Sequence, residues 1–561
     1  MLKKINKKEI LILSLISFVF CIPLLFDHLY IGADLGFHIS RIKGLADSIS
    51  AHQLPAYISP YTNNGFGYAM GLFYGDIFLY PFAFLYLIGV PVIIVWKIAI
   101  TIITVFTVIF AFILARNVFS KTSTQVISVF LYTMSNVRIS YAYNTDGLGT
   151  LLAMMFLPLL LLAIYKMFIK KEEPWLLLSL SFVCILLSHL LSFTLSVLFF
   201  GTLLIIDYKN LNKDRIFFIL KSASLAILLS AFFLFPLLEQ MMSQKFWSSF
   251  LNTSTNLDFF INSQKPLLYV FSDYLFDTYP ANSYVGCIYS IGAILSYVLY
   301  KAKNKKDKSL VVAFVFLILG LFLETKILPL YKVSFIRYVQ FIYRINIIIT
   351  PLSIFIIGRM LDVYKNAIIV ECLLIGYCIF NVGDAFYAIV KNDYQISNNA
   401  DYKELYDIGA VKINDSHYFN QYEIGMGEYL PYTNSYPYYL ADTNIEFANE
   451  DVAVWDYRRI GTTFEFSTNY SYSDYIYLPL SWYKGYYYQE INEDGDVIFE
   501  KKCIYNEYSK RVGMLMEDGE HHYKVYYKGT SVQHISLYIS IFAWVALIIY
   551  ELNRKTSKVT I

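Results

Sequence analysis

Long apolar runs alternate with short polar stretches along most of the chain. The first run, 10–26, follows a cluster of four lysines. A helix needs about 20 apolar residues to cross the hydrocarbon core of a bilayer. The later runs are 96–115, 122–137, 147–168, 175–188, 190–206, 216–238, 285–300, 310–323, 341–357, 367–383 and 534–550. The pattern therefore predicts a polytopic α-helical membrane protein with about 12 transmembrane helices.

The segment 77–95 is the ambiguous part of this pattern. It is apolar, but it contains Pro81, Gly89 and Pro91, and no basic loop separates it from the next run. If it were a full span, the later loops rich in Lys and Arg would lie outside, against the positive-inside rule. We therefore expect a re-entrant or interfacial hairpin here, with the loop 27–76 outside and both termini in the cytoplasm.

The pattern changes to a period of two between about residues 385 and 533. Residues 462–467, 475–478 and 523–527 alternate between apolar and polar, and Asp-Gly pairs at 494–495 and 518–519 supply turns. Such alternation between turns is typical of antiparallel strands. The sequence predicts a transmembrane domain (1–384), an extracytoplasmic antiparallel β domain (385–533), and a final transmembrane helix with a cytoplasmic tail (534–561).

Composition supports a membrane protein and excludes several kinds of site. Hydrophobic residues make up 57% of the 561 residues and charged residues 16%, whereas about a quarter of a soluble protein is charged. The six cysteines have neither a disulfide nor a metal-binding spacing. No phosphate-binding loop, zinc pattern or basic nucleic-acid patch is evident outside the predicted cytoplasmic loops, so we expect no nucleic-acid partner.

The densest polar cluster beside an apolar run is Asp34, His38 and Arg41. If this stretch is helical, the spacing i, i+4 and i+7 brings the three side chains to one face. Ionisable residues at a membrane are costly and mark candidate functional sites. The alternative is an interfacial helix whose polar face is simply solvated.

The same stretch resembles a known family. Asp34 to Arg41 is similar to the Asp-x-x-x-His-x-x-Arg element of the YfhO-like, PTPS-related bacterial membrane proteins of the GT-C glycosyltransferase superfamily. Further similar segments are Gly65-Phe66-Gly67 with Phe73-Tyr74, Phe156-Leu157-Pro158-Leu159, Leu187-Ser188-His189, 339–344 and 478–486. Two positions depart from the family pattern: Thr150 replaces a frequent acidic residue, with Asp146 nearby, and Ile342 replaces a proline. The resemblance implies a GT-C-like fold over nearly the whole chain, while the departures argue against a two-carboxylate mechanism.

The resemblance also implies roles for individual residues. Asp34 corresponds to the catalytic carboxylate of the first outer loop, where a divalent metal such as Mg²⁺ or Mn²⁺ can also bind in some members. The expected contacts to the donor phosphate or substrate are His38, Arg41, Arg337, Gln340 and Arg344. The weaker expected contacts to acceptor or glycan are Tyr74, Asp146, His189, Glu239 and Trp482.

The implied function is an inverting sugar transfer on the outer face of the bacterial plasma membrane. The donor would be a polyprenyl-phosphate-linked sugar, and the acceptor teichoic or lipoteichoic acid, a polysaccharide or a glycolipid. One alternative is a lipid or polysaccharide flippase or transporter, which predicts polar residues deep within several spans. Another is a non-catalytic envelope-assembly protein in which the β domain is the working part.

Overall fold

The fold was analysed in a computed structural model, which describes residues 6–248, 260–271, 285–303, 305–333, 339, 341–364, 367–391, 395–404, 410–414, 417–425, 427–433, 446–447, 453–492 and 494–559. The chain forms two compact units, each built from separate segments. Unit 1 comprises Met1–Leu35, Pro91–Ala226 and Asn252–Ala400, and unit 2 comprises Gly36–Val90, Ile227–Leu251 and Asp401–Ile561. The first loop from Gly36 onward and the C-terminal β region, far apart in sequence, therefore belong to the same unit.

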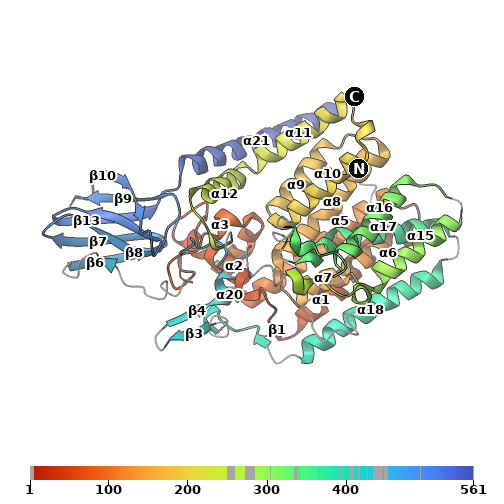
Figure 1. Cartoon of the computed structure of the whole chain (residues 1–561), viewed down its shortest axis with the longest axis horizontal. Coiled ribbons are helices and arrows are strands. Elements are labelled where there is room, and N and C mark those ends of the chain that lie inside the picture. Colours follow the sequence, from red (N-terminus) through yellow and green to blue (C-terminus); the bar gives the residue numbers. More distant parts are fainter. Residues whose placement is uncertain are drawn as a thin grey trace. The chain divides into compact units, whose positions relative to one another are not determined.

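Unit 1 is a bundle of helices (Figure 1). Its helices are α1 (Lys7–Cys21), α5 (Val92–Val118), α6 (Thr122–Thr133), α7 (Asn136–Tyr143), α8 (Leu148–Tyr165), α9 (Trp175–Leu186), α10 (Leu190–Ile206), α15 (Ala293–Ala302), α16 (Lys308–Leu323), α17 (Asn346–Val363) and α18 (Ile368–Lys391). A short antiparallel pair joins β1 (His28–Tyr30) to β2 (Gln395–Ser397). Helix α11 (Lys213–Leu229) continues from unit 1 into unit 2.

The long apolar helices indicate a multi-pass membrane protein. In the described part of the chain, five segments are long and apolar enough to cross a bilayer: Lys7–Leu25, Val92–Val118, Leu148–Lys170, Ile342–Val363 and Ser531–Arg554. A bent pair, α11 and α12 (Ala231–Ser243), makes a sixth if it is one span, and five further apolar helices are shorter. The count of about 12 transmembrane helices stays a prediction.

The ambiguous segment 77–95 divides into two elements. Helix α4 (Tyr80–Leu87) has 8 residues, about 12 Å at 1.5 Å per residue, and cannot cross a membrane. Gly89 has a φ of +90°, and α5 then begins at Val92, directly after Pro91. The expected boundary at residue 96 was therefore wrong by four residues, because Pro91 starts the helix.

Helices α11 and α12 meet at an angle of 76°, and the last helix, α21 (Ser531–Val559), supplies polar groups to this bend. Ser540 accepts a hydrogen bond from the Phe232 N–H (2.9 Å) and donates one to the Leu228 carbonyl (3.0 Å). The Trp544 indole N–H donates to the Leu229 carbonyl (3.2 Å). A helix break in an apolar setting leaves backbone groups without partners, and α21 satisfies three of them.

The C-terminal part of unit 2 contains two antiparallel sheets. The five-stranded sheet has the order β10-β9-β13-β7-β6, and the four-stranded sheet has the order β11-β12-β8-β5. Their strands are β5 (Glu446–Phe447), β6 (Ala453–Ile460), β7 (Thr463–Tyr470), β8 (Asp474–Ser481), β9 (Tyr486–Ile491), β10 (Val497–Lys502), β11 (Ile504–Tyr505), β12 (Arg511–Met516) and β13 (Gly519–Tyr527). Alternate residues such as Phe464 and Phe466 on β7 are fully buried, as the period of two predicts. The predicted antiparallel β region before the last helix is therefore confirmed.

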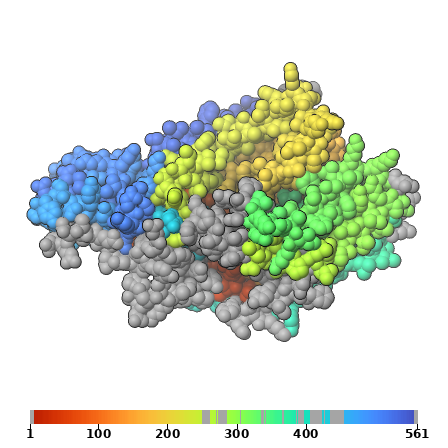
Figure 2. Space-filling view, viewed as in Figure 1, coloured from red at the N-terminus to blue at the C-terminus, as the bar shows by residue number. Residues whose placement is uncertain are grey.

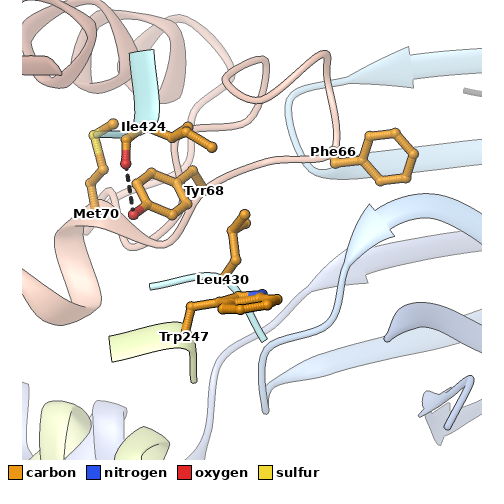
Figure 3. Packing of buried hydrophobic residues seen from close by; sticks show 6 residues of the cluster. All are labelled: Phe66, Tyr68, Met70, Trp247, Ile424 and Leu430. Atoms are coloured by element: carbon orange, nitrogen blue, oxygen red, sulfur yellow. Dashed lines mark hydrogen bonds between the residues drawn. The ribbon is translucent and has the colours of Figure 1, made fainter. Parts of the chain in front are cut away.

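The remaining segments of unit 2 meet in a small apolar core (Figure 3). Phe66, Tyr68 and Met70 of the first loop pack with Trp247, Ile424 and Leu430. The Tyr68 hydroxyl donates to the Ile424 carbonyl (3.1 Å). The Gly65-Phe66-Gly67 segment, which resembles a family motif, therefore lies where three distant parts of unit 2 pack together. Unit 2 also contains α2 (Leu35–Ser50), α3 (Met70–Phe73), α20 (Gln421–Ile424) and the strand pair β3 (Ala410–Asn414) and β4 (His417–Asn420).

We expect Ser540→Ala to lower the free energy of unfolding by about 1–3 kcal/mol, because it leaves a backbone N–H and a backbone carbonyl at the α11–α12 bend without partners. Thermal unfolding of the purified full chain measures the change. The control is Thr194→Ala, which removes an exposed hydroxyl that bonds only within its own helix, to the Leu190 carbonyl. Equal stability of the two variants would contradict a role for α21 in holding the bend.

Candidate functional site

The segment before Asp34 is paired with the turn that precedes α8. The Ala33 and Asp34 N–H groups donate to the carbonyls of Asn144 (3.4 Å) and Thr145 (2.9 Å). The Gly32 N–H donates to Oδ2 of Asp146 (2.7 Å), which is buried. A Cβ on residue 32 would lie 2.5 Å from the Asn144 carbonyl oxygen and 2.6 Å from Asp146 Oδ2. Glycine is therefore required at this position, and the pairing sets the position of Asp34.

Asp34 is an exposed residue of unit 1. Desolvation by the surrounding protein raises the pKa of Asp34 to about 6, and the positive charge of Arg344 opposes this rise. Asp34 is thus exposed as a residue, while the protein around its carboxyl group disfavours the charged form. A carboxylate whose pKa lies near neutral pH can take up and release a proton under physiological conditions.

The start of this loop is fixed by Lys97 of α5, a residue to which the sequence assigned no role. Its ammonium group donates to the carbonyls of Phe26 (2.7 Å) and His28 (3.1 Å). These contacts satisfy two carbonyls just after the first transmembrane segment. A lysine in an apolar helix is a recognisable signal of such a contact, but the sequence does not reveal which carbonyls it meets.

Asp146 and Arg344 lie near Asp34, but in different ways. Asp146 is 1% exposed, so its carboxyl group holds the Gly32 backbone and is not open to an acceptor. Burial raises the pKa of Asp146, and the negative charge of Asp34 adds to this rise. Arg344 is half-buried; it donates to the Val339 carbonyl (3.1 Å), and its guanidinium lies 5.1 Å from the Phe341 ring centroid.

Arg41 belongs to unit 2, where it forms a fully buried ion pair. Its Nε donates to Oδ1 of Asp76 (2.9 Å), and its other nitrogens bond His38 Nδ1 (3.0 Å) and the Gly75 carbonyl (3.0 Å). The guanidinium lies 3.9 Å from the centroid of the Tyr74 ring. Burial raises the pKa of Asp76, and Arg41 opposes that rise. Arg41 thus contacts His38, Tyr74 and Asp76 at the same time, within the interior of unit 2.

The expectation of one helical face for Asp34, His38 and Arg41 is wrong for Asp34. Helix α2 begins at Leu35, directly after Asp34, and the Asp34 N–H donates to the Thr145 carbonyl. His38 and Arg41 do share a face, as their hydrogen bond shows. Asp76, the ion-pair partner of Arg41, was not identified from the sequence, although a lone acidic residue at the start of an apolar stretch is a usable signal.

The weaker candidates have structural contacts. His189 precedes α10 and bonds the Ser192 hydroxyl (2.8 Å) through Nδ1. Glu239 forms an ion pair with Lys484 (3.0 Å) and accepts a hydrogen bond from Thr530. Trp482 is half-buried, with its ring centroid 4.5 Å from that of Tyr505. Arg337 and Gln340 lie outside the described residues.

Metal binding at Asp34 was tested against the side chains present. Among the described residues, no group of three or more His, Cys, Asp or Glu side chains is arranged to hold a metal ion. The carboxyl group of Asp146, which lies near Asp34, is buried and bonded to the Gly32 N–H. Asp34 and Asp146 therefore do not form a metal site by themselves.

Comparisons with known proteins assign no family. No family model matches the chain. An uncharacterised protein of Lactococcus lactis subsp. cremoris (strain MG1363) is 28% identical over 252 residues, which cover 43% of this chain and 41% of that protein. The match thus spans less than half of the relative's length.

Two solved structures show a distant likeness, both of the arabinofuranosyltransferase AftD from mycobacteria. One, a point mutant, has a TM-score of 0.46 at 13% identity, covering 69% of this chain and 28% of AftD. The other has a TM-score of 0.40 at 12% identity, covering 72% and 28%. At these values the likeness by itself assigns neither a fold nor an activity to this chain.

We expect Arg41→Gln to lower the free energy of unfolding by about 3–5 kcal/mol, because it leaves the Asp76 carboxyl group buried without its ion-pair partner. Thermal unfolding of the purified full chain measures the loss. A matched control on the same helix is Lys43→Gln, which removes a partly exposed pair with Asp47 and should cost less than about 1 kcal/mol. If the two variants unfold alike, Arg41 is not the structural residue described here.

Proposed function

We propose that the chain is a GT-C-type glycosyltransferase of the bacterial plasma membrane. It transfers a sugar from a polyprenyl-phosphate donor to an envelope acceptor on the outer face, namely teichoic or lipoteichoic acid, a polysaccharide or a glycolipid. The observation that carries this proposal is Asp34, an exposed residue with a pKa raised to about 6. The resemblance of residues 34–41 and the later motifs to the YfhO-like proteins supports the reaction class.

Asp34 acts as the general base in this proposal. Its carboxylate accepts the proton of an acceptor hydroxyl while the hydroxyl oxygen attacks the anomeric carbon. The bond from that carbon to the phosphate oxygen breaks, and the polyprenyl phosphate leaves with the electron pair. Attack from the side opposite the phosphate inverts the configuration. The raised pKa suits the role, because general bases work best when their pKa lies near the operating pH.

Arg344 stabilises the negative charge of the departing phosphate in this proposal. A guanidinium can bind phosphate oxygens through two parallel hydrogen bonds, and cations placed where charge develops lower the reaction barrier. The contacts with Val339 and Phe341 limit where this side chain can move. Arg337 and Gln340 remain expected donor contacts from the sequence, whereas Arg41 contributes indirectly by stabilising α2.

We expect Asp34→Asn to lower sugar transfer about 10²–10⁴-fold, because the amide cannot accept the acceptor proton. Incorporation of labelled sugar into envelope polymer, in cells carrying only the variant, measures the effect. Asp47→Asn on α2 is the matched control and should keep wild-type transfer. Wild-type transfer by a correctly inserted Asp34→Asn protein would refute the catalytic assignment, since a transporter or assembly protein does not need this base.

The thermal stability of Asp34→Asn shows whether a loss of transfer comes from the missing carboxylate or from unfolding of the protein. The folded-state pKa of Asp34 is raised from 3.8 to about 6, so the native state favours the protonated form. Its contribution to stability is present at low pH and is lost as the pH rises through about 6. Above that pH, Asp34→Asn should therefore unfold at the same temperature as the wild type or higher, measured by thermal unfolding at pH 5 and pH 8.

The pH dependence of transfer tests the pairing with Arg344. Activity should rise with pH and level off above about 6, as Asp34 becomes deprotonated. Arg344→Gln removes a charge that lowers the Asp34 pKa, so the midpoint of the profile should move to higher pH. Arg116→Gln, at the far end of α5, should leave the midpoint unchanged. An unmoved midpoint in Arg344→Gln would show that its charge does not act on the base.

A further inference from the structure

Unit 1 contains a cavity of about 560 Å³. The proposed transfer reaction does not use it. The cavity is lined by residues of α5, α6, α8, α10, α16 and α17, including Ala115, Phe199 and Phe316. Its volume is within the range of sites that hold small organic ligands, about 300–1,000 Å³. The green segment that contains α15 and α16 lies on the face drawn in Figure 2.

The wall of this cavity stays apolar even where prolines interrupt its helices. Pro158 of α8 and Pro351 of α17 both line it. Pro158 cannot donate to the Met154 carbonyl, one turn earlier. The hydroxyl of Tyr132, another lining residue, donates to that carbonyl instead (2.6 Å). This carbonyl is therefore satisfied within the protein and does not require water or a polar ligand group in the cavity.

The cavity has a polar rim with an excess of positive charge. Its two acidic residues are neutralised, since Asp207 pairs with Arg215 (2.9 Å) and Asp307 pairs with Arg359 (2.8 Å). Lys171 and Lys308 also line the cavity and are exposed. Within the described ranges, neither lysine forms an ion pair. An apolar interior with two cations at its edge matches an amphiphile with an anionic headgroup.

The cavity lies toward the opposite end of the helices from Asp34. Helix α8 begins two residues after Asp146, and its lining residues begin at Pro158. That separation of ten residues corresponds to about 15 Å along the helix axis. The rim lysines belong to loops that the charge pattern predicts to be cytoplasmic. The cavity is thus distinct from the candidate active site.

We propose that this cavity binds an anionic phospholipid of the inner leaflet, with hydrocarbon in the apolar interior and the phosphate between Lys171 and Lys308. Basic pockets between transmembrane helices bind anionic lipid headgroups, and phospholipid is available wherever the rim meets the bilayer. The site goes beyond the proposed transfer reaction and does not depend on it. Removing the bound lipid should lower stability, because a ligand bound only to the folded state stabilises that state.

Lipid retention by the purified full chain tests this site. The chain is delipidated in detergent, incubated with dioleoyl phosphatidylglycerol or dioleoyl phosphatidylcholine, and bound lipid is counted by native mass spectrometry. The wild type should retain one phosphatidylglycerol in preference to phosphatidylcholine. The double variant Lys171→Gln/Lys308→Gln should lose about tenfold or more of that retention, whereas Lys306→Gln, an exposed lysine outside the lining, should not.

A cavity-filling variant separates the interior from the outer surface. Ala115→Phe should abolish retention if the hydrocarbon enters the cavity. If that variant does not insert, the lysine variants still decide the question, because they change only exposed side chains. Equal retention of both lipids, unchanged retention in the double lysine variant, or full retention in an inserted Ala115→Phe protein would overturn the proposal. Preferential retention of undecaprenyl phosphate from an equimolar mixture would overturn the choice of ligand.

Discussion

The hydrogen bond from the Gly32 N–H to the buried Asp146 carboxyl group is the contact on which the candidate site depends. It joins the loop after the first helix to the turn before α8 across 114 residues of sequence. Both partners are restricted: residue 32 has no room for a Cβ, and Asp146 has a φ of +53°. The pairing continues through Ala33 and Asp34. Asp34 is therefore fixed by backbone contacts on both segments, and it remains an exposed residue.

The polar residues of the first loop divide into two kinds once their contacts are known. Asp34 is exposed and has an unfavourable environment for its charge, which is the usual condition of a residue retained for chemistry. Arg41 and Asp76 are buried, and their ion pair compensates the free-energy cost of removing the two charges from water. In the proposed mechanism the same short motif thus contains a reactive group, Asp34, and a structural anchor, Arg41, a distinction that residue type and spacing do not make.

The sequence predicted local features well and long-range contacts poorly. Hydrophobic runs located α8, α10 and α16 to within a few residues, and the period of two located β7, β8 and β13. The position after the first apolar run drew attention to the cluster of Asp34, His38 and Arg41, and the resemblance to the YfhO-like proteins selected Asp34 among them. The partners of these residues were not predicted, because the pairing of Gly32 with Asp146 or of Arg41 with Asp76 depends on tertiary packing. No local period encodes such a pairing.

The bend between α11 and α12 has a consequence for how the chain is made. The serine that satisfies its backbone lies 308 residues after Phe232. At about 5–20 residues per second, roughly 15–60 s pass between synthesis of the two. During that interval the bend carries polar groups that hydrocarbon cannot solvate. The nascent α11–α12 segment must therefore stay near water, near the insertion machinery, or unbent until the last helix arrives.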